Sequence, residues 1–194
     1  MSIHAPSRSY VDQALAALAA GEPVVVADDR EGHLVFASAM ATPALLAFTV
    51  RHTAGFVRVA MTAEDCRRLD LPPMHYRGDP AQRVTVDRRG PGTGISGADR
   101  ARTIAALAAP DTVPGDFTRP GHVVPVQAYA GAAAGIAEAA IELVRRSGLS
   151  ESAAYSTLVS AEEPSCVAGG SELRRFAVEH GLVLVPLRPE SRAR

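Results

Sequence analysis

Hydrophobic positions along the chain follow two spacings, one typical of helices and the other of strands. Apolar residues between Tyr10 and Ala20 recur three or four positions apart, which predicts an amphipathic helix that ends at Gly21. The β-branched run at 23–27 predicts a short buried strand. The same patterns predict helices at 43–52, 63–69, 97–108, 132–146 and 172–180, and strands at 34–36, 56–61, 84–87, 122–126, 155–160 and 182–187.

These elements alternate along the chain without an internal repeat and without a linker. The length of 194 residues is sufficient for one domain with a substantial core. The pattern therefore predicts a single α+β or α/β domain over residues 1–187, followed by a polar tail at 188–194.

Composition mainly excludes classes of function. The formal net charge of −1 provides no field that would attract nucleic acid or an anionic membrane surface. No apolar run is long enough to span a bilayer. Cys66 and Cys166 match no metal-binding or redox spacing, so we expect a reduced, cytoplasmic setting.

Candidate chemistry is concentrated in three polar stretches, of which the first is the DDREGH sequence at 28–33. Carboxylates at the end of a strand can bind a divalent cation through oxygen, and Arg30 can clamp an anion. The alternative interpretation is a solvated acidic turn without a ligand.

The second stretch, residues 92–103, is a glycine-rich approach to the start of a helix. Ser96 is the candidate N-cap, with Asp99 three residues further on. Free backbone N–H groups and the helix dipole favour a phosphate here, and Arg100 and Arg102 can add charged contacts. The alternative is a tight turn that caps a surface helix.

The third stretch, Arg119-Pro120-Gly121-His122, places a histidine at the start of a strand. Histidine is the usual general acid or base near neutral pH, so His122 is a candidate catalytic residue. The alternative is a histidine with a structural role only.

Taken together, the chain resembles the 3,4-dihydroxy-2-butanone 4-phosphate synthase family of the riboflavin pathway. The matching segments occur in family order: ALAALAAGEPVVVADD, REG, TVRHTAGFV, LDLPPM, GTGISGADRARTI, DFTRPGHVVPV and GIAEAAIELVRRSGL. The resemblance implies a single α+β domain, with a mixed sheet and flanking helices, that forms a homodimer with active sites near the subunit interface. It also implies a magnesium-organised reaction that releases formate from ribulose 5-phosphate. Substrate contacts are then expected from Arg30, Thr93, Gly94, Ser96, Asp99, Arg100 and Thr103.

The chain also departs from the family pattern at several functional positions. His33 stands where the family has a substrate-binding Asp, Arg58 replaces a Cys, and Thr157 lies where an essential Glu is expected. Ile136 occupies the position of a metal-binding His, and Ala133 that of a substrate-binding Arg. Because isoleucine has no lone pair to donate, we expect the family metal site to be lost, with Glu31 a possible ligand and Asp28 and Asp29 as alternatives in the same loop.

Three hypotheses for the function follow. The leading one is a diverged enzyme of lyase or isomerase type that acts on a sugar phosphate or a related phosphorylated small molecule. It would use Glu31, His33 and His122 for acid–base catalysis and Arg58 as a substrate contact. The second is a non-catalytic binding or regulatory paralog, and the third is a genuine riboflavin-pathway synthase of low activity.

Overall fold

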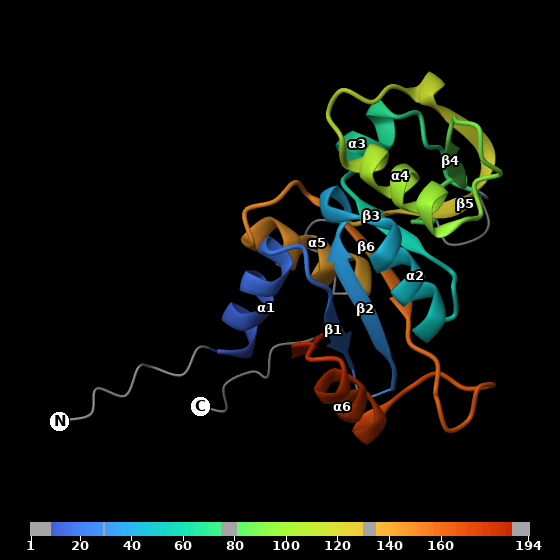
Figure 1. Cartoon of the computed structure of the whole chain (residues 1–194). Coiled ribbons are helices and arrows are strands. Elements are labelled where there is room, and N and C mark those ends of the chain that lie inside the picture. The colour runs from blue at the N-terminus through green and yellow to red at the C-terminus, as the bar shows by residue number, and fades with distance from the viewer. Residues whose placement is uncertain (1–8, 29, 75–80, 130–134, 188–194) are drawn as a thin grey trace.

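The protein is built around one mixed sheet of seven strands (Figure 1). The structure, a computed structural model, describes residues 9–28, 30–74, 81–129 and 135–187. The strands lie in the order β4-β5-β3-β6-β2-β1-β7, and both parallel and antiparallel pairs occur. Their bounds are β1 (Val24–Ala27), β2 (Gly32–Ala37), β3 (Arg58–Met61), β4 (Val86–Arg88), β5 (Phe117–Gln127), β6 (Ser152–Thr157) and β7 (Leu184–Pro186).

Six α-helices in the described residues connect and cover these strands. They are α1 (Tyr10–Ala19), α2 (Pro43–His52), α3 (Ala63–Arg68), α4 (Gly97–Ala108), α5 (Ile136–Arg146) and α6 (Gly170–Glu179), with short 3₁₀ turns η1 (Ser38–Met40) and η2 (Pro114–Asp116). Four of the helices begin at a Ser or Thr whose hydroxyl oxygen accepts a first-turn amide hydrogen bond. Such a cap determines where a helix starts through residues adjacent in the sequence, and for this reason the sequence pattern located the starts of these helices well.

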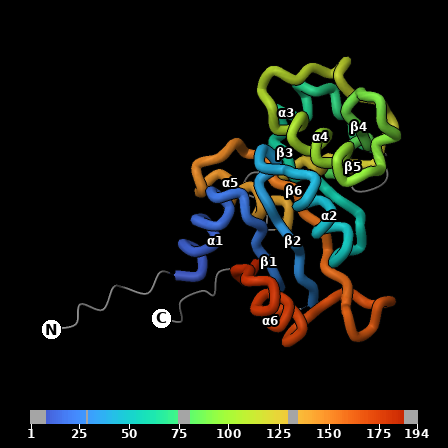
Figure 2. The backbone as a smooth tube through the Cα atoms, viewed as in Figure 1, coloured from blue at the N-terminus to red at the C-terminus, as the bar shows by residue number. Residues whose placement is uncertain are grey.

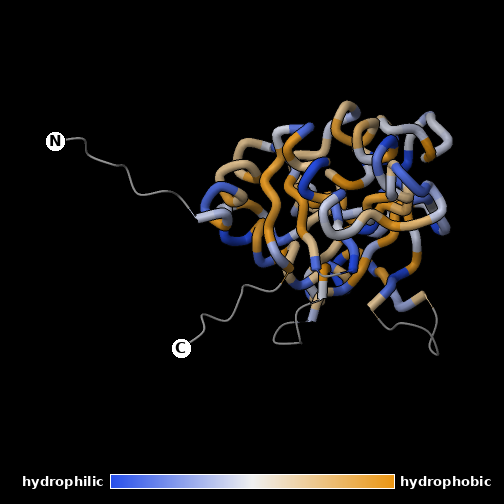
Figure 3. Tube along the Cα trace, turned by 90° about the horizontal axis from the view of Figure 1, so that it is seen from below, coloured by the Kyte–Doolittle hydropathy of each residue, from blue (hydrophilic) through white to orange (hydrophobic). Residues whose placement is uncertain are grey.

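Hydrophobic packing divides the helices between the two faces of the sheet. α1 and α5 cover one face, where Val35, Val124 and Tyr155 point. α2, α3 and α4 cover the other face, and α6 extends it over β1 (Figures 1 and 2). Seen from below, the hydrophobic residues run along the strands in the interior (Figure 3). The result is a three-layer domain in which strand ends carry polar side chains.

The predicted fold class, a single α+β domain with a mixed sheet, is confirmed. The helices expected at 43–52 and 97–108 occur at those bounds, the first after the cap Thr42 and the second after the predicted cap Ser96. Residues 132–134 of a third predicted helix, and the tail at 188–194, lie outside the described residues. No helix in the described part of the chain is both long and apolar enough to cross a membrane.

Three local predictions were wrong. β5 begins at Phe117 rather than at residue 122, because β4 supplies an antiparallel partner that the local sequence does not reveal. β6 begins at Ser152 rather than at residue 155, since pairing with β2 and β3 extends it toward its start. α6 begins at Gly170, after Gly169 as its N-cap, rather than at residue 172.

Candidate active site

A row of polar side chains lies at one end of the sheet face covered by α1 and α5. In the strand register, Arg58 of β3 pairs with Val124 of β5 and with Tyr155 of β6, while Thr157 pairs with His33 of β2. Residues two apart on a strand share a face. His122, Arg58, Thr157 and His33 therefore point to the same side of four adjacent strands.

The start of α5 lies at the same end of the sheet. α5 packs on β6, and a short connection joins the end of the helix to the start of the strand. Thr157, at the far end of β6, is therefore directed toward the beginning of α5. Ile136, which the sequence placed at the family's metal-ligand position, is the first residue of this helix and packs against the hydrophobic cluster.

A chain of hydrogen bonds links Arg58 to Glu31. The Arg58 guanidinium donates to Thr157 Oγ1 over 3.0 Å, and Thr157 Oγ1 lies 3.2 Å from His33 Nδ1. His33 Nε2 lies 3.3 Å from a carboxylate oxygen of Glu31. Because an ionised carboxylate can only accept, Nε2 carries the hydrogen of the neutral ring, and Nδ1 is left to accept the hydrogen of the Thr157 hydroxyl. The contacts thus select one tautomer of His33, which donates to Glu31.

Burial keeps the His33 ring neutral. Its side chain is 3 % exposed, and this desolvation lowers its pKa, an effect that the charge of Arg58 reinforces and Glu31 opposes. Both ring nitrogens already have protein partners, whereas the Glu31 side chain is 41 % exposed. The arrangement gives His33 the geometry of a residue that positions Glu31, and leaves Glu31 as the group open to a ligand.

A second acid–base pair lies on β4 and β5. Asp87 Oδ2 is 2.6 Å from His122 Nδ1, and Asp87 Oδ1 accepts the backbone N–H of His122 over 3.0 Å. The Asp87 side chain is 10 % exposed and that of His122 is 42 % exposed. The carboxylate therefore orients the ring and leaves Nε2 facing outward, as a general acid or base requires. Sequence reasoning missed Asp87, whose one signal is an acidic residue inside a short apolar strand.

Two glycines make room for this pair. Gly94 has a φ of +88°, and a Cβ there would overlap the Asp87 carboxylate and come within 2.9 Å of His122 Nδ1. A Cβ at Gly121 would overlap the backbone of Val86. The glycine-rich stretch therefore lies at the candidate site, where Gly94 packs against the Asp87–His122 pair.

At the start of α4, where the sequence predicts a phosphate site, the carboxylate of Asp99 is engaged by its neighbours in the chain. Ser96 Oγ accepts the Asp99 amide over 3.0 Å, and Asp99 forms an ion pair with Arg102. Hydrogen bonding from the Ser96 hydroxyl, followed by that of Arg102 and of the Gly94 amide, lowers the pKa of Asp99. A carboxylate in this position satisfies the helix N-terminus and repels a second anion.

Two further predicted ligands of the substrate are engaged inside the protein. The Arg100 side chain is buried, donates to the carbonyl of Gly55 over 3.1 Å, and has a pKa lowered by that burial. Thr103 Oγ1 accepts the Arg88 amide over 2.9 Å and donates to the Asp99 carbonyl over 3.0 Å. We therefore leave Ser96, Asp99, Arg100 and Thr103 out of the proposed site, since their polar groups hold α4 in place. Arg30 is exposed beside Glu31, and Thr93 is exposed beside Gly94.

The described residues do not fit a magnesium site. They contain no group of three or more His, Cys, Asp or Glu side chains arranged to hold a metal ion. Glu31 offers one carboxylate, both nitrogens of His33 are engaged, and the Arg58 cation lies on the same side of the sheet. Magnesium prefers several oxygen ligands in octahedral geometry. Asp29 and Ala133 lie outside the described residues.

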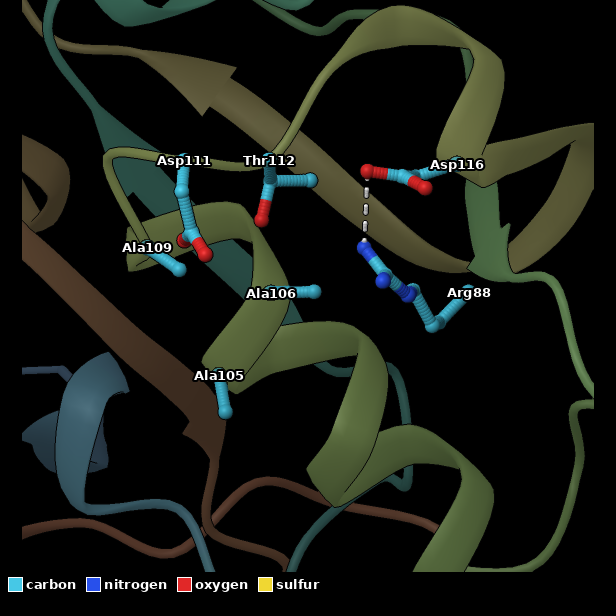
Figure 4. Close-up of a pocket in the computed structure, with 7 residues that line it drawn as sticks. All are labelled: Arg88, Ala105, Ala106, Ala109, Asp111, Thr112 and Asp116. Carbon is cyan, nitrogen blue, oxygen red and sulfur yellow. Dashed lines mark ion pairs between the residues drawn. The ribbon is translucent and has the colours of Figure 1, made fainter.

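Two hollows of the described surface lie away from these pairs. Figure 4 shows one of about 280 Å³ beside α4, lined by three alanines and by an ion pair of 3.1 Å between Arg88 and Asp116. A larger hollow of about 810 Å³ lies along α5, whose lining residues are both apolar and charged, and it also takes in residues of α1, β1, α3 and β7. Glu31, His33, Asp87 and His122 line neither, so the candidate chemistry resides at the strand ends.

An α+β domain with two oriented acid–base pairs on one sheet face has the construction of a small-molecule enzyme. The chain belongs to the 3,4-dihydroxy-2-butanone 4-phosphate synthase family, whose model matches residues 12–188. Members of this family are enzymes of riboflavin biosynthesis.

Relatives agree with this assignment. The riboflavin biosynthesis protein RibBA of Salinispora tropica is 47% identical over 189 residues, which cover 91% of this chain and 47% of that protein. The chain thus spans about half the length of the curated relatives it matches. A crystal structure of the synthase of Candida albicans has a TM-score of 0.86 at 33% identity, covering 96% of this chain and 95% of that one. A synthase structure in complex with two magnesium ions has a TM-score of 0.85 at 36% identity, covering 93% and 94%.

Proposed function

We propose that this protein is an enzyme that moves protons on a phosphorylated sugar or a related phosphorylated small molecule, with lyase or isomerase chemistry. The observation that carries the proposal is the presence of two oriented acid–base pairs, His122–Asp87 and Glu31–His33, on one face of the sheet. Family membership supports a phosphorylated substrate.

Each residue has a role that its contacts allow. His122 Nε2 exchanges a proton with the substrate, while Asp87 stabilises the protonated ring. Glu31 exchanges a proton at the other end of the row, with His33 holding its carboxylate. Two such groups on opposite sides of a bound carbon chain suit the removal of a proton next to a carbonyl and its return at a different carbon.

We further propose that the outcome of the reaction differs from that of the family synthase. The support is the replacement of a metal ligand by Ile136 and of a carboxylate by Thr157, which leaves the described donor set unsuited to magnesium. A riboflavin-pathway synthase of ribulose 5-phosphate is the second candidate, favoured by the 47% identity to a RibBA protein. The two intact acid–base pairs speak against a non-catalytic paralog.

Two assays on the purified protein separate these candidates. Incubation with ribulose 5-phosphate in D₂O should transfer deuterium to carbon, as followed by proton NMR, while formate release stays far below enzyme rates of about 1 s⁻¹. Formate release at that rate would establish the second candidate instead. Ligand binding without deuterium transfer would establish the non-catalytic alternative. The variant His122→Gln should abolish the transfer.

The proposal also covers the oligomeric state and the cellular location of the protein. We propose that the protein is a homodimer, as the resemblance to the family implies. We also propose that it is cytoplasmic, which is supported by its two cysteines, both of them free thiols. Sedimentation equilibrium of the purified chain tests the dimer, and a monomer at micromolar concentration would contradict it.

A further inference from the structure

Arg58 lies between the two acid–base pairs. It is on β3, which is flanked by β5 with His122 and by β6 with Thr157. Neighbouring strands lie about 4.8 Å apart, and two residues along a strand span about 6.6 Å. A small ligand that contacts His122 is therefore within reach of the guanidinium.

The guanidinium is held in place without being neutralised. Its carbon Cζ lies 4.8 Å from the centre of the Tyr155 ring and 5.6 Å from that of Phe56. Its one hydrogen bond among the described residues goes to the neutral Thr157 hydroxyl. No carboxylate in the described part of the chain forms an ion pair with it, and its Nε is shielded from solvent without an acceptor. Two rings and a hydroxyl thus fix a full positive charge whose donors are mostly unused.

This charge lies on the side of the sheet where the described residues fail to provide a magnesium site. A fixed guanidinium and a divalent cation repel each other, whereas a guanidinium and a planar oxyanion attract and can form two parallel hydrogen bonds. An oxyanion that develops beside the reacting carbon requires such a charge. Among the described residues, Arg58 lies between the two acid–base pairs and can supply it.

We propose that the Arg58 guanidinium is the cation of this site and binds a planar oxyanion of the phosphorylated ligand, so that binding requires no divalent metal. The inference rests on the proposed function, because it presumes a phosphorylated ligand between His122 and Glu31. It adds that the preferred ligand carries a carboxylate, or forms an enediolate, next to the carbon that exchanges its proton.

Isothermal titration calorimetry with two probes tests this inference. The first probe is 5-phosphoribonate, which has a carboxylate where ribulose 5-phosphate has its reacting carbons, and the second is ribulose 5-phosphate itself. Each is titrated in EDTA and in excess magnesium. We expect 5-phosphoribonate to bind more tightly than ribulose 5-phosphate, and with the same affinity in EDTA as in magnesium.

Variants of Arg58 provide the second measurement. Arg58→Gln should weaken binding of 5-phosphoribonate by about tenfold or more, the loss expected for a charged hydrogen-bonding partner. Arg58→Lys, which keeps the charge, should retain part of the affinity, and circular dichroism shows that each variant is folded. The matched control is Arg145→Gln, which removes an exposed arginine paired with Glu142 at the other end of α5 and should leave binding unchanged.

The outcomes distinguish this inference from the function on which it rests. Binding that disappears in EDTA, or that survives Arg58→Gln undiminished, overturns the role of Arg58 and leaves the proposed function standing. If neither probe binds the wild-type protein in either buffer, the phosphorylated substrate itself is wrong, and both proposals fail.

Discussion

At the scale of single residues, the site depends on pairs that lie far apart in the sequence. His122 could be selected from its local context, a histidine at the start of a strand. Asp87 could not, because the contact that gives it a role joins residues 35 positions apart. His33 and Arg58 were candidates from the sequence and Thr157 was noted there only as a replaced carboxylate, but the contacts that join the three come from the strand register.

The role of Asp87 leads to the first prediction. Asp87→Asn keeps the size of the side chain but removes the charge that stabilises protonated His122, and it permits the wrong ring tautomer. Deuterium transfer to ribulose 5-phosphate should fall by about a hundredfold or more, with little change in ligand affinity. NMR rates and calorimetry measure the two effects. Asp111→Asn, at an exposed turn, is the control, and an equal loss there would contradict the assignment.

His33 leads to a prediction about stability and pH. Its folded-state pKa is lowered, chiefly by burial, so below the ordinary value of 6.5 the unfolded chain binds a proton that the folded protein does not. The free energy of unfolding should therefore decrease as the pH falls below 6.5. In His33→Gln this decrease should be smaller, although His52, whose pKa is also lowered by burial, retains its own contribution. Urea unfolding of both proteins at pH 7 and pH 5 measures the difference, and equal decreases would refute the prediction.

At the scale of elements, local signals and long-range pairing account for what the sequence could and could not predict. α2 and α4 were located at their observed bounds because a capping hydroxyl starts each one. β5 was underestimated because its first residues are stabilised by β4, and local patterns do not report a distant partner. The segment before α4 illustrates both effects: its helix cap, Ser96, was predicted from the local sequence, but the contacts of Asp99 with Arg102 and with the Gly94 amide were not.

Gly94 in that segment provides a test with a matched control. Gly94→Ala forces a side chain into a positive φ and against the Asp87–His122 pair, whereas Gly148→Ala creates a similar strain at φ +82° with nothing within 4 Å. Gly148→Ala should cost about 1 kcal/mol of unfolding free energy and leave deuterium transfer unchanged. Gly94→Ala should cost more and should reduce the transfer strongly. Similar transfer rates in the two variants would show that the pair does not depend on this close approach.

At the scale of the whole molecule, one sheet joins the site to both hydrophobic layers. The candidate side chains lie on or beside five adjacent strands, β4, β5, β3, β6 and β2, and those strands contribute to the clusters under α1 and α5 and under α2, α3 and α4. A ligand that bridges the strand ends therefore binds only the folded domain. By mass action, a phosphorylated ligand at a hundred times its Kd should add about 2.7 kcal/mol to the free energy of unfolding.

For a chain of this length, that stabilisation corresponds to a rise in Tm of about 5–10 °C. We expect it with 5-phosphoribonate in EDTA as well as in magnesium, and a much smaller rise with ribonate at the same concentration, because ribonate lacks the phosphate. Differential scanning calorimetry measures all three. A rise in Tm that occurs only with magnesium would show that ligand binding requires the metal. Equal rises for ribonate and 5-phosphoribonate would mean that the carboxylate alone is recognised, and that the phosphorylated substrate class is wrong.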